Sequence, residues 1–179
     1  SVSVMIALTG TAVALFAFSW PQGQTNSDTF HSYFGQFRGG TISSSLIFKD
    51  NSEVKTADAG DILAVIDDHT DDYGWFESTL GSAVIIGHSD QRVTIYGNLD
   101  AESIPASLGA SPFVSTGTPL GTSGNSGWQE GESCLEFQVL DTKSGISINP
   151  RMLMPKIGAE LPVSMGYITL DDEKGVTHY

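Results

Sequence analysis

The residues with the clearest chemical potential in this chain are one cysteine, one neighbouring glutamate and four histidines. Cys134 and Glu136 are two positions apart in a segment of strand-like composition, so their side chains would point to the same face of a strand. Together they could supply two arms of a metal site. A zinc site needs at least three protein ligands, so two are too few. A third ligand would have to come from one of four histidines: His31, His69, His88 or His178.

Cys134 could alternatively act as a nucleophile. Attack by a thiol requires the thiolate form, which a nearby cation or a helix N-terminus stabilises. The neighbouring charged residues are Glu132 and Glu136, and both are acidic. This environment disfavours the thiolate, so we interpret Cys134 as a small buried hydrophobic residue.

A second chemical feature is the acidic run Asp67-Asp68-His69-Thr70-Asp71-Asp72. Carboxylates of this kind can hold a hard cation such as calcium. The run lacks the spaced ligands and the glycine of a calcium-binding loop. A solvated acidic turn is therefore the favoured interpretation, and a cation site is the alternative.

Composition limits the class of protein and of partner. The chain has 179 residues, of which 40% are hydrophobic and 16% charged, so it can bury the core of a single domain and is not a disordered chain. Its formal net charge is -13, with only 8 Lys and Arg residues, which would repel nucleic acid and anionic lipids. Solubility is the favoured interpretation of this charge, and recognition of a partner with a basic or neutral surface is the alternative.

Short β-branched and aromatic segments between turn-forming residues predict an all-β fold with an antiparallel sheet. No stretch has a sustained helical period; the one modest helix candidate, Ala101–Leu108, is limited by Pro105. The predicted strands are Ser45–Phe48, Glu53–Thr56, Ile62–Ile66, Ala83–Gly87, Arg92–Tyr96, Leu135–Leu140 and Tyr167–Leu170.

The N-terminal segment Val2–Phe18 is strongly apolar but has no Lys or Arg before it, which is not typical of a signal peptide. Thr9-Gly10-Thr11 divides it into two runs of strand length. We expect Val2–Leu8 and Ala12–Phe18 to be strands packed on the domain; a membrane anchor is the alternative. Because the sequence begins without an initiator Met, we expect the start of the gene product to precede Ser1.

Five sequence motifs occur in the same order as in one known family, and at nearly the same spacing. They are Val84-Ile85-Ile86-Gly87-His88-Ser89-Asp90, Val93-Thr94-Ile95-Tyr96-Gly97-Asn98-Leu99, Pro119-Leu120-Gly121-Thr122-Ser123-Gly124-Asn125-Ser126-Gly127, Leu135-Glu136-Phe137-Gln138-Val139 and Asn149-Pro150. From Trp20 to about Leu153 the chain resembles the LytM-type (lysostaphin-like) zinc endopeptidases. Upstream, Val54–Ile62 resembles the strand, glycine turn and strand that follow the family's first metal motif.

The resemblance implies a β domain like a duplicated hybrid motif, with long loops that form a groove. In the family, zinc is held by a His and an Asp four residues apart and by the second His of a His-x-His. Two further His residues, one of them in a Tyr-x-His-Leu motif, assist the reaction. Such a site needs three ligands and an open position for the reactive water.

This chain departs from the family at every one of those positions. Counting back without gaps places Thr41 and Ser45 at the first ligand pair, and a slip of two residues places Ser43 and Ile47 there. Asn98 replaces the His of Tyr-x-His-Leu, and Cys134 and Glu136 replace the two His residues of His-x-His. We therefore expect no zinc, no other cofactor and no peptidase activity.

His88 matches a framework His of the family that is not a zinc ligand, and we interpret it as structural. We expect the five former-site positions, Thr41, Ser45, Asn98, Cys134 and Glu136, to converge at the base of one groove. The candidate partner contacts beside the groove are Trp75, Tyr96 and Trp128, because aromatic residues dominate interface energy. The expected groove walls are Phe34–Gly40, Asp67–Phe76, Ala101–Ser115 and Gly121–Gly131.

The expected function is that of an inactive LytM-like module outside the cytoplasm that binds a cell-envelope protein and regulates it, with a cell-wall hydrolase as the favoured partner. Peptidoglycan is a further possible ligand. A structural role in an envelope assembly is the alternative, and an active zinc endopeptidase is the least favoured. The expected organisation is an N-terminal strand segment at 1–19, the degenerate domain at 20–155 and an extension with one strand at 156–179.

Overall fold

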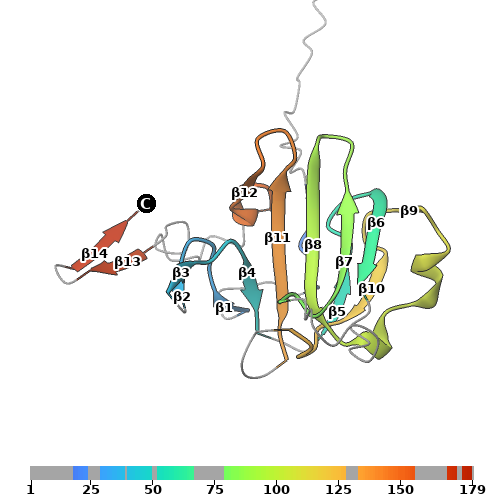
Figure 1. Ribbon diagram of the computed structural model, residues 1–179, viewed down its shortest axis with the longest axis horizontal. Coiled ribbons are helices and arrows are strands. Elements are labelled where there is room, and N and C mark those ends of the chain that lie inside the picture. Colours follow the sequence, from blue (N-terminus) through green and yellow to red (C-terminus); the bar gives the residue numbers. More distant parts are fainter. Residues whose placement is uncertain are drawn as a thin grey trace, which may run out of the picture.

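The computed structural model describes residues 18–23, 29–38, 40–49, 52–66, 79–127, 133–155, 169–172 and 175–178. These residues form β-strands and three short 3₁₀ helices (Figure 1). The elements are β1 (Phe30–Ser32), β2 (Phe37–Arg38), β3 (Thr41–Ile42), β4 (Leu46–Phe48), β5 (Glu53–Lys55), β6 (Gly60–Ile66), β7 (Ser82–Gly87), β8 (Arg92–Leu99), η1 (Ala101–Ser103), η2 (Ala106–Gly109), β9 (Phe113–Val114), β10 (Pro119–Thr122), β11 (Leu135–Asp141), β12 (Ile146–Ile148), η3 (Pro150–Met152), β13 (Thr169–Asp172) and β14 (Gly175–His178).

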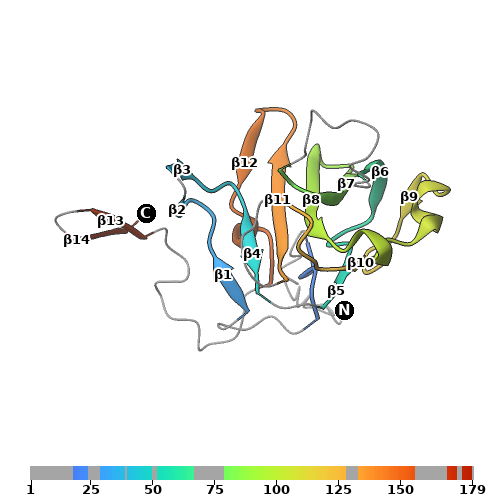
Figure 2. The ribbon, with the colours of Figure 1, turned by 60° about the horizontal axis from the view of Figure 1, so that its bottom comes forward.

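One antiparallel sheet dominates the domain. Its strand order is β1-β4-β11-β8-β7-β6-β9, and β12 also pairs with β11. β5 and β10 form a separate pair that lies close to β7 and β8 in both views (Figures 1 and 2). The predicted all-β fold is confirmed.

Most long strands were predicted and most short ones were not. The six strands predicted between Ser45 and Leu140 are present as β4 to β8 and β11. The strands that the sequence did not predict have two to four residues, too few for a pattern to emerge. The C-terminal extension, expected to contain one strand, contains the β13–β14 hairpin. The modest helix candidate Ala101–Leu108 forms two short 3₁₀ helices, η1 and η2, separated at Pro105, the residue expected to limit it.

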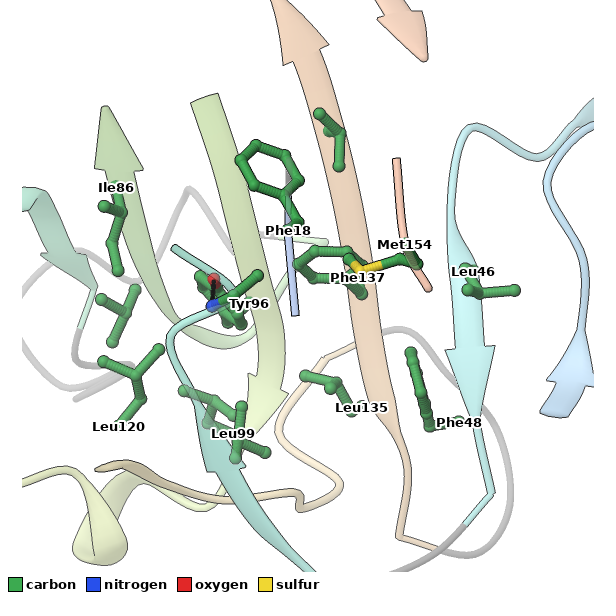
Figure 3. Packing of buried hydrophobic residues seen from close by; sticks show 14 of the residues in the cluster. Phe18, Leu46, Phe48, Ile86, Tyr96, Leu99, Leu120, Leu135, Phe137 and Met154 are labelled. Carbon is green, nitrogen blue, oxygen red and sulfur yellow. Dashed lines mark hydrogen bonds between the residues drawn. The ribbon is translucent and has the colours of Figure 1, made fainter. Parts of the chain in front are cut away.

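Alternation along β11 separates the core from the opposite face of the sheet. Leu135, Phe137 and Val139 are fully buried in the hydrophobic core, which Phe48 and Tyr96 also enter (Figure 3). Since successive strand residues point to opposite faces, Glu136 and Gln138 lie on the other face. The hydrophobic core therefore fixes which residues of β11 are left for a site.

The segment that precedes the first strand is part of this core. Phe18 is buried, its backbone N–H donates to the Leu153 carbonyl at 3.2 Å, and its ring centroid lies 5.0 Å from that of His88. The packed unit thus includes Phe18 and Ser19, before the boundary expected at Trp20. Val2–Leu8 and the rest of the second predicted run lie outside the described residues. Within the described part of the chain, no helix is long and apolar enough to span a membrane.

Tyr96 links the sheet to the turn before β6. Its side chain is fully buried, and its hydroxyl oxygen accepts a 2.7 Å hydrogen bond from the backbone N–H of Ala57. Burial is the main reason that the pKa of Tyr96 is raised from 10.0 to about 12. The folded protein therefore holds the phenol in its neutral form.

This shift predicts a loss of stability in alkali. Because the folded pKa lies above the unfolded one, stability is complete below pH 10.0 and falls as the pH rises towards about 12. The total loss should be about 3 kcal/mol, at 1.36 kcal/mol per pKa unit. Urea unfolding from pH 8 to pH 12 should show this loss in the natural protein and not in Tyr96→Phe. The same alkaline loss in both proteins would contradict the assignment to Tyr96.

Candidate functional site

The candidate site lies where three strands meet around Glu136. On β11, Glu136 is opposite Ile47 of β4 on one side and Gly97 of β8 on the other. Since strand pairing fixes the direction of each side chain, this register also places Ser45 and Asn98 close to β11. The former-site positions are thus positioned by backbone hydrogen bonds and do not require a metal.

Ser45 and Glu136 form the first pair of former-site residues. The Ser45 hydroxyl donates a 2.6 Å hydrogen bond to Glu136 Oε1, and Gln138 Nε2 donates to the same oxygen at 3.0 Å. Both Ser45 and Glu136 are buried. Two donors on one oxygen offset part of the penalty of burying a carboxylate. Gln138 was missed from the sequence, although its spacing of two from Glu136 puts it on the same face of β11.

Asn98 and Cys134 form the second pair. The Asn98 Nδ2 lies 2.8 Å from the Cys134 carbonyl oxygen and 3.1 Å from Cys134 Sγ. It also lies 2.6 Å from the Gly124 carbonyl oxygen, while Asn98 Oδ1 accepts from the Gly127 N–H at 2.8 Å. Asn98 is fully buried. Its carboxamide is therefore committed to contacts within the protein.

A leucine side chain covers the sheet beside Glu136. A Cβ atom at Gly97 would come within 3.2 Å of Leu80 Cδ2, so glycine at this position lets Leu80 approach the strand. The Leu80 carbonyl oxygen also accepts a 2.6 Å hydrogen bond from the Asn98 N–H. Leu80, which the sequence did not single out, thus occupies space over the strand position opposite Glu136.

The two registers considered for the first ligand pair both lead to residues without ligand chemistry. In the ungapped register, Ser45 contacts Glu136, while Thr41 is exposed on the β2–β3 hairpin opposite Arg38. In the slipped register, Ile47 is buried beside Glu136, and Ser43 forms a local turn in which its hydroxyl accepts from the Ser45 N–H at 3.2 Å. The structure therefore joins four of the five expected positions in two buried pairs, and Thr41 differs from them in being exposed.

One expected partner contact is wrong. Tyr96 is fully buried and packs against Phe137, with ring centroids 5.2 Å apart, so a partner cannot reach it. Its β8 position faces the core because Tyr96 is paired with the inward-facing Phe137. Trp75, Trp128 and the acidic run Asp67–Asp72 lie outside the described residues.

His88 has the surroundings of a structural residue, as expected. Its Nδ1 lies 2.9 Å from the Ala59 carbonyl oxygen and its Nε2 lies 2.9 Å from Thr94 Oγ1. The ring is buried next to Phe18. Both ring nitrogens are thus engaged in joining β7 and β8 to the turn before β6.

The donor set at this site does not fit zinc. Within the described ranges, no group of three or more His, Cys, Asp or Glu side chains could hold a metal ion. Hydrogen-bond donors also point at the two potential ligands, Ser45 and Gln138 at the Glu136 carboxylate and Asn98 at the Cys134 sulfur. A zinc ligand directs its lone pairs at the metal, whereas here Glu136 Oε1 and Cys134 Sγ accept hydrogen bonds.

The sequence model of Peptidase family M23 matches residues 45–150, which is more than half of the chain. This chain belongs to peptidase family M23. The match begins at Ser45 and ends at Pro150, so it includes every former-site position except Thr41. The LytM-type resemblance identified in the sequence is confirmed.

Solved structures show the same fold at low sequence identity. They include a zinc-containing peptidase from Vibrio cholerae (TM-score 0.58, 20% identity, covering 82% of this chain and 41% of that chain). The catalytic domain of the antimicrobial peptidase lysostaphin from Staphylococcus simulans has a TM-score of 0.54 and 18% identity, over 69% of this chain and 89% of that one. A chain of the SpoIIIAH and SpoIIQ complex has a TM-score of 0.58 and 15% identity, over 76% of this chain and 99% of that one.

The M23 domain of this chain spans about two fifths of the length of the Vibrio cholerae peptidase. No curated protein sequence matches the chain significantly. At these identities the structural similarities establish the fold, and they leave the activity to be argued from this chain's own residues.

The Ser45–Glu136 contact predicts that restoring one ligand alone is harmful. Ser45→Asp would place a second carboxylate at a hydroxyl position that is 2.6 Å from Glu136 Oε1. Repulsion between the two carboxylates should make the free energy of unfolding of Ser45→Asp lower than that of Ser45→Asn by about 1–4 kcal/mol. Asn is the control because it has the size of Asp and no charge. The difference should shrink as the pH falls from 7 to about 4, because one carboxyl group then takes up a proton. Equal urea stability of the two variants at pH 7 would contradict this account.

Proposed function

We propose that this chain is a catalytically inactive M23 module that binds a protein of the cell envelope and regulates it, with a cell-wall hydrolase as the favoured partner. The observation that carries the proposal is the pairing of former-site residues with one another. Ser45 is bonded to Glu136 and Asn98 is bonded to Cys134. Groups that an enzyme would direct at metal and substrate are used here for internal contacts.

The side-chain chemistry supports the absence of peptidase activity. Zinc peptidases need three ligands that leave one position open, so that the bound water can become a nucleophile near neutral pH. Thr41 and Ser45 offer hydroxyl groups where such a site has His and Asp. Asn98 cannot exchange a proton at neutral pH, as the imidazole in its place would. Each of these changes acts against hydrolysis by itself.

The preserved framework supports a binding role. The strand register around Glu136 and the glycine-containing turns persist although the ligands do not. A groove that holds a peptide in an enzyme can hold a segment of a partner after catalysis is lost. In this proposal Ser45, Asn98, Cys134 and Glu136 lie at the groove base, whereas Thr41 is exposed on the β2–β3 hairpin. Trp75 and Trp128 remain the proposed aromatic contacts on its walls.

Charge and context point to a protein partner outside the cytoplasm. The net charge of -13 favours a basic or neutral surface over nucleic acid. The proposed location is the periplasm or the cell surface, where peptidoglycan-directed members of the family act. A second candidate, a structural part of an envelope assembly, is favoured by one similar structure whose chain belongs to the SpoIIIAH and SpoIIQ complex.

Peptidoglycan solubilisation assays test the proposal. The purified chain alone should release no material from peptidoglycan, and it should increase the rate of release by an envelope amidase that it binds. Boiled chain, added at the same concentration, is the control. Chelator-sensitive cleavage by the chain alone would overturn the inactive assignment. Binding to the hydrolase without any change in its rate would overturn regulation and favour the structural role.

Replacement of Trp128 tests where the partner binds. If Trp128 lies in the interface, Trp128→Ala should weaken partner binding by about 1–3 kcal/mol, or roughly 5- to 150-fold in Kd. The control is Ile146→Ala, which removes an exposed apolar side chain from β12, outside the expected groove walls. Isothermal titration calorimetry should show unchanged affinity for the control. Equal affinities for both variants would remove this wall from the binding surface.

A further inference from the structure

The residues at two former catalytic positions contact each other, and together they contact a loop. Asn98 Nδ2 reaches Cys134, and the Asn98 side chain also contacts both ends of the loop Gly124–Gly127. We propose that Asn98 is a positioning residue that holds this loop, one wall of the proposed groove, against β8 and β11. The inference rests on the proposed function for the role of the groove, while the positioning itself concerns only this chain.

The backbone at Asn98 already favours this arrangement. Its φ is 62°, in the left-handed region that Asn enters far more readily than most residues. In this conformation its N–H donates to the Leu80 carbonyl at 2.6 Å and its carbonyl accepts from the Gly124 N–H at 2.7 Å. The backbone of one residue therefore connects the segment before β7 to the start of the loop. Histidine is also enriched at positive φ, so the substitution of Asn for His is compatible with the same backbone.

The carboxamide completes the connection because it can donate and accept at once. Nδ2 donates towards the Gly124 carbonyl, at 2.6 Å, and Oδ1 accepts from the Gly127 N–H, at 2.8 Å. An aspartate at this position has no N–H to donate, and it would face two carbonyl oxygens. Asn98 thus bonds to both ends of the loop through one side chain.

Close packing shows that the loop has little freedom once it is bound. A Cβ at Gly127 would lie 2.8 Å from the Leu80 carbonyl carbon, and a Cβ at Gly81 would lie 2.4 Å from the Gly127 nitrogen. Ser126 Oγ donates to the Leu99 carbonyl at 2.6 Å and accepts from the Ser82 N–H at 2.9 Å. The loop therefore contacts both the segment Leu80–Ser82 and Leu99. Loss of the Asn98 carboxamide would remove its hydrogen bonds to the Gly124 carbonyl and the Gly127 N–H.

Cys134 provides a reporter of this contact. It is the chain's one cysteine, it is buried, and its sulfur lies 3.1 Å from Asn98 Nδ2. Thiol reagents modify a buried cysteine only when the structure around it opens. The rate of Cys134 labelling under native conditions therefore measures how often this region opens.

The test compares Asn98→Gly and Asn98→Asp with two controls. Asn98→Gly keeps access to positive φ and removes the carboxamide, whereas Asn98→Asp keeps the shape and loses the donor. Asn125→Asp changes an exposed residue of the same loop in the same way. Tyr96→Phe weakens the core away from the loop, so it controls for global destabilisation. The readouts are the rate at which a maleimide labels Cys134 and the hydrogen exchange of the Gly124 and Gly127 amides.

Both Asn98 variants should label Cys134 about tenfold faster or more, which is the effect of losing one or two hydrogen bonds. The Gly124 amide should exchange faster in both variants, and the Gly127 amide, whose acceptor oxygen Asp retains, should exchange faster in Asn98→Gly. Asn125→Asp should match the natural protein, and Tyr96→Phe should speed labelling only as far as its lower global stability requires. The proposal would be overturned if the Asn98 variants labelled no faster than Tyr96→Phe at equal global stability. It would also be overturned if their loop amides exchanged at the rate seen in the natural protein.

Two further measurements keep the outcomes distinct. If the Asn98 variants do not fold, Ser126→Ala removes a loop contact at the surface of the same region and should raise the exchange of the loop amides; unchanged exchange would then overturn the proposal. If the Asn98 variants loosen the loop but bind an identified partner as the natural protein does, positioning stands and the groove is removed as the binding site.

Discussion

The pairing of β11 with β4 on one side and β8 on the other is the constraint on which the rest of the site depends. It sets Glu136 between Ile47 and Gly97. A shift of one residue would turn Glu136 into the core and Phe137 out of it, so the hydrophobic effect maintains the register. Ser45 and Glu136, like Asn98 and Cys134, lie together because the register of the sheet places them so.

Within that frame, residues at the positions that the family resemblance assigns to the zinc site hydrogen-bond to one another. A carboxylate buried at the centre of a sheet is unfavourable unless its oxygens are bonded. Ser45 and Gln138 provide donors to Glu136, and Asn98 provides one to Cys134. Both pairs join β11 to its neighbours, so positions that carry chemistry in a zinc peptidase contribute here to structure. These contacts stabilise the sheet at those positions without a metal ion.

The sequence predicted the sheet well because its long strands carry dense β-branched and aromatic runs. It also predicted the family, since the glycine-containing motifs occur in a fixed order. It could not show which strand pairs with which. For that reason Tyr96 was considered as a contact, although its pairing with the inward-facing Phe137 places it in the core. The positive φ of Asn98 and the approach of Leu80 to Gly97 likewise depend on contacts between segments far apart in the chain.

The central claim is that the framework of an M23 site remains while its zinc chemistry has been lost. Elemental analysis of the purified natural chain, after incubation with excess zinc and removal of the unbound metal, tests it most directly. The natural chain should contain no stoichiometric zinc. One zinc per natural chain would contradict the account.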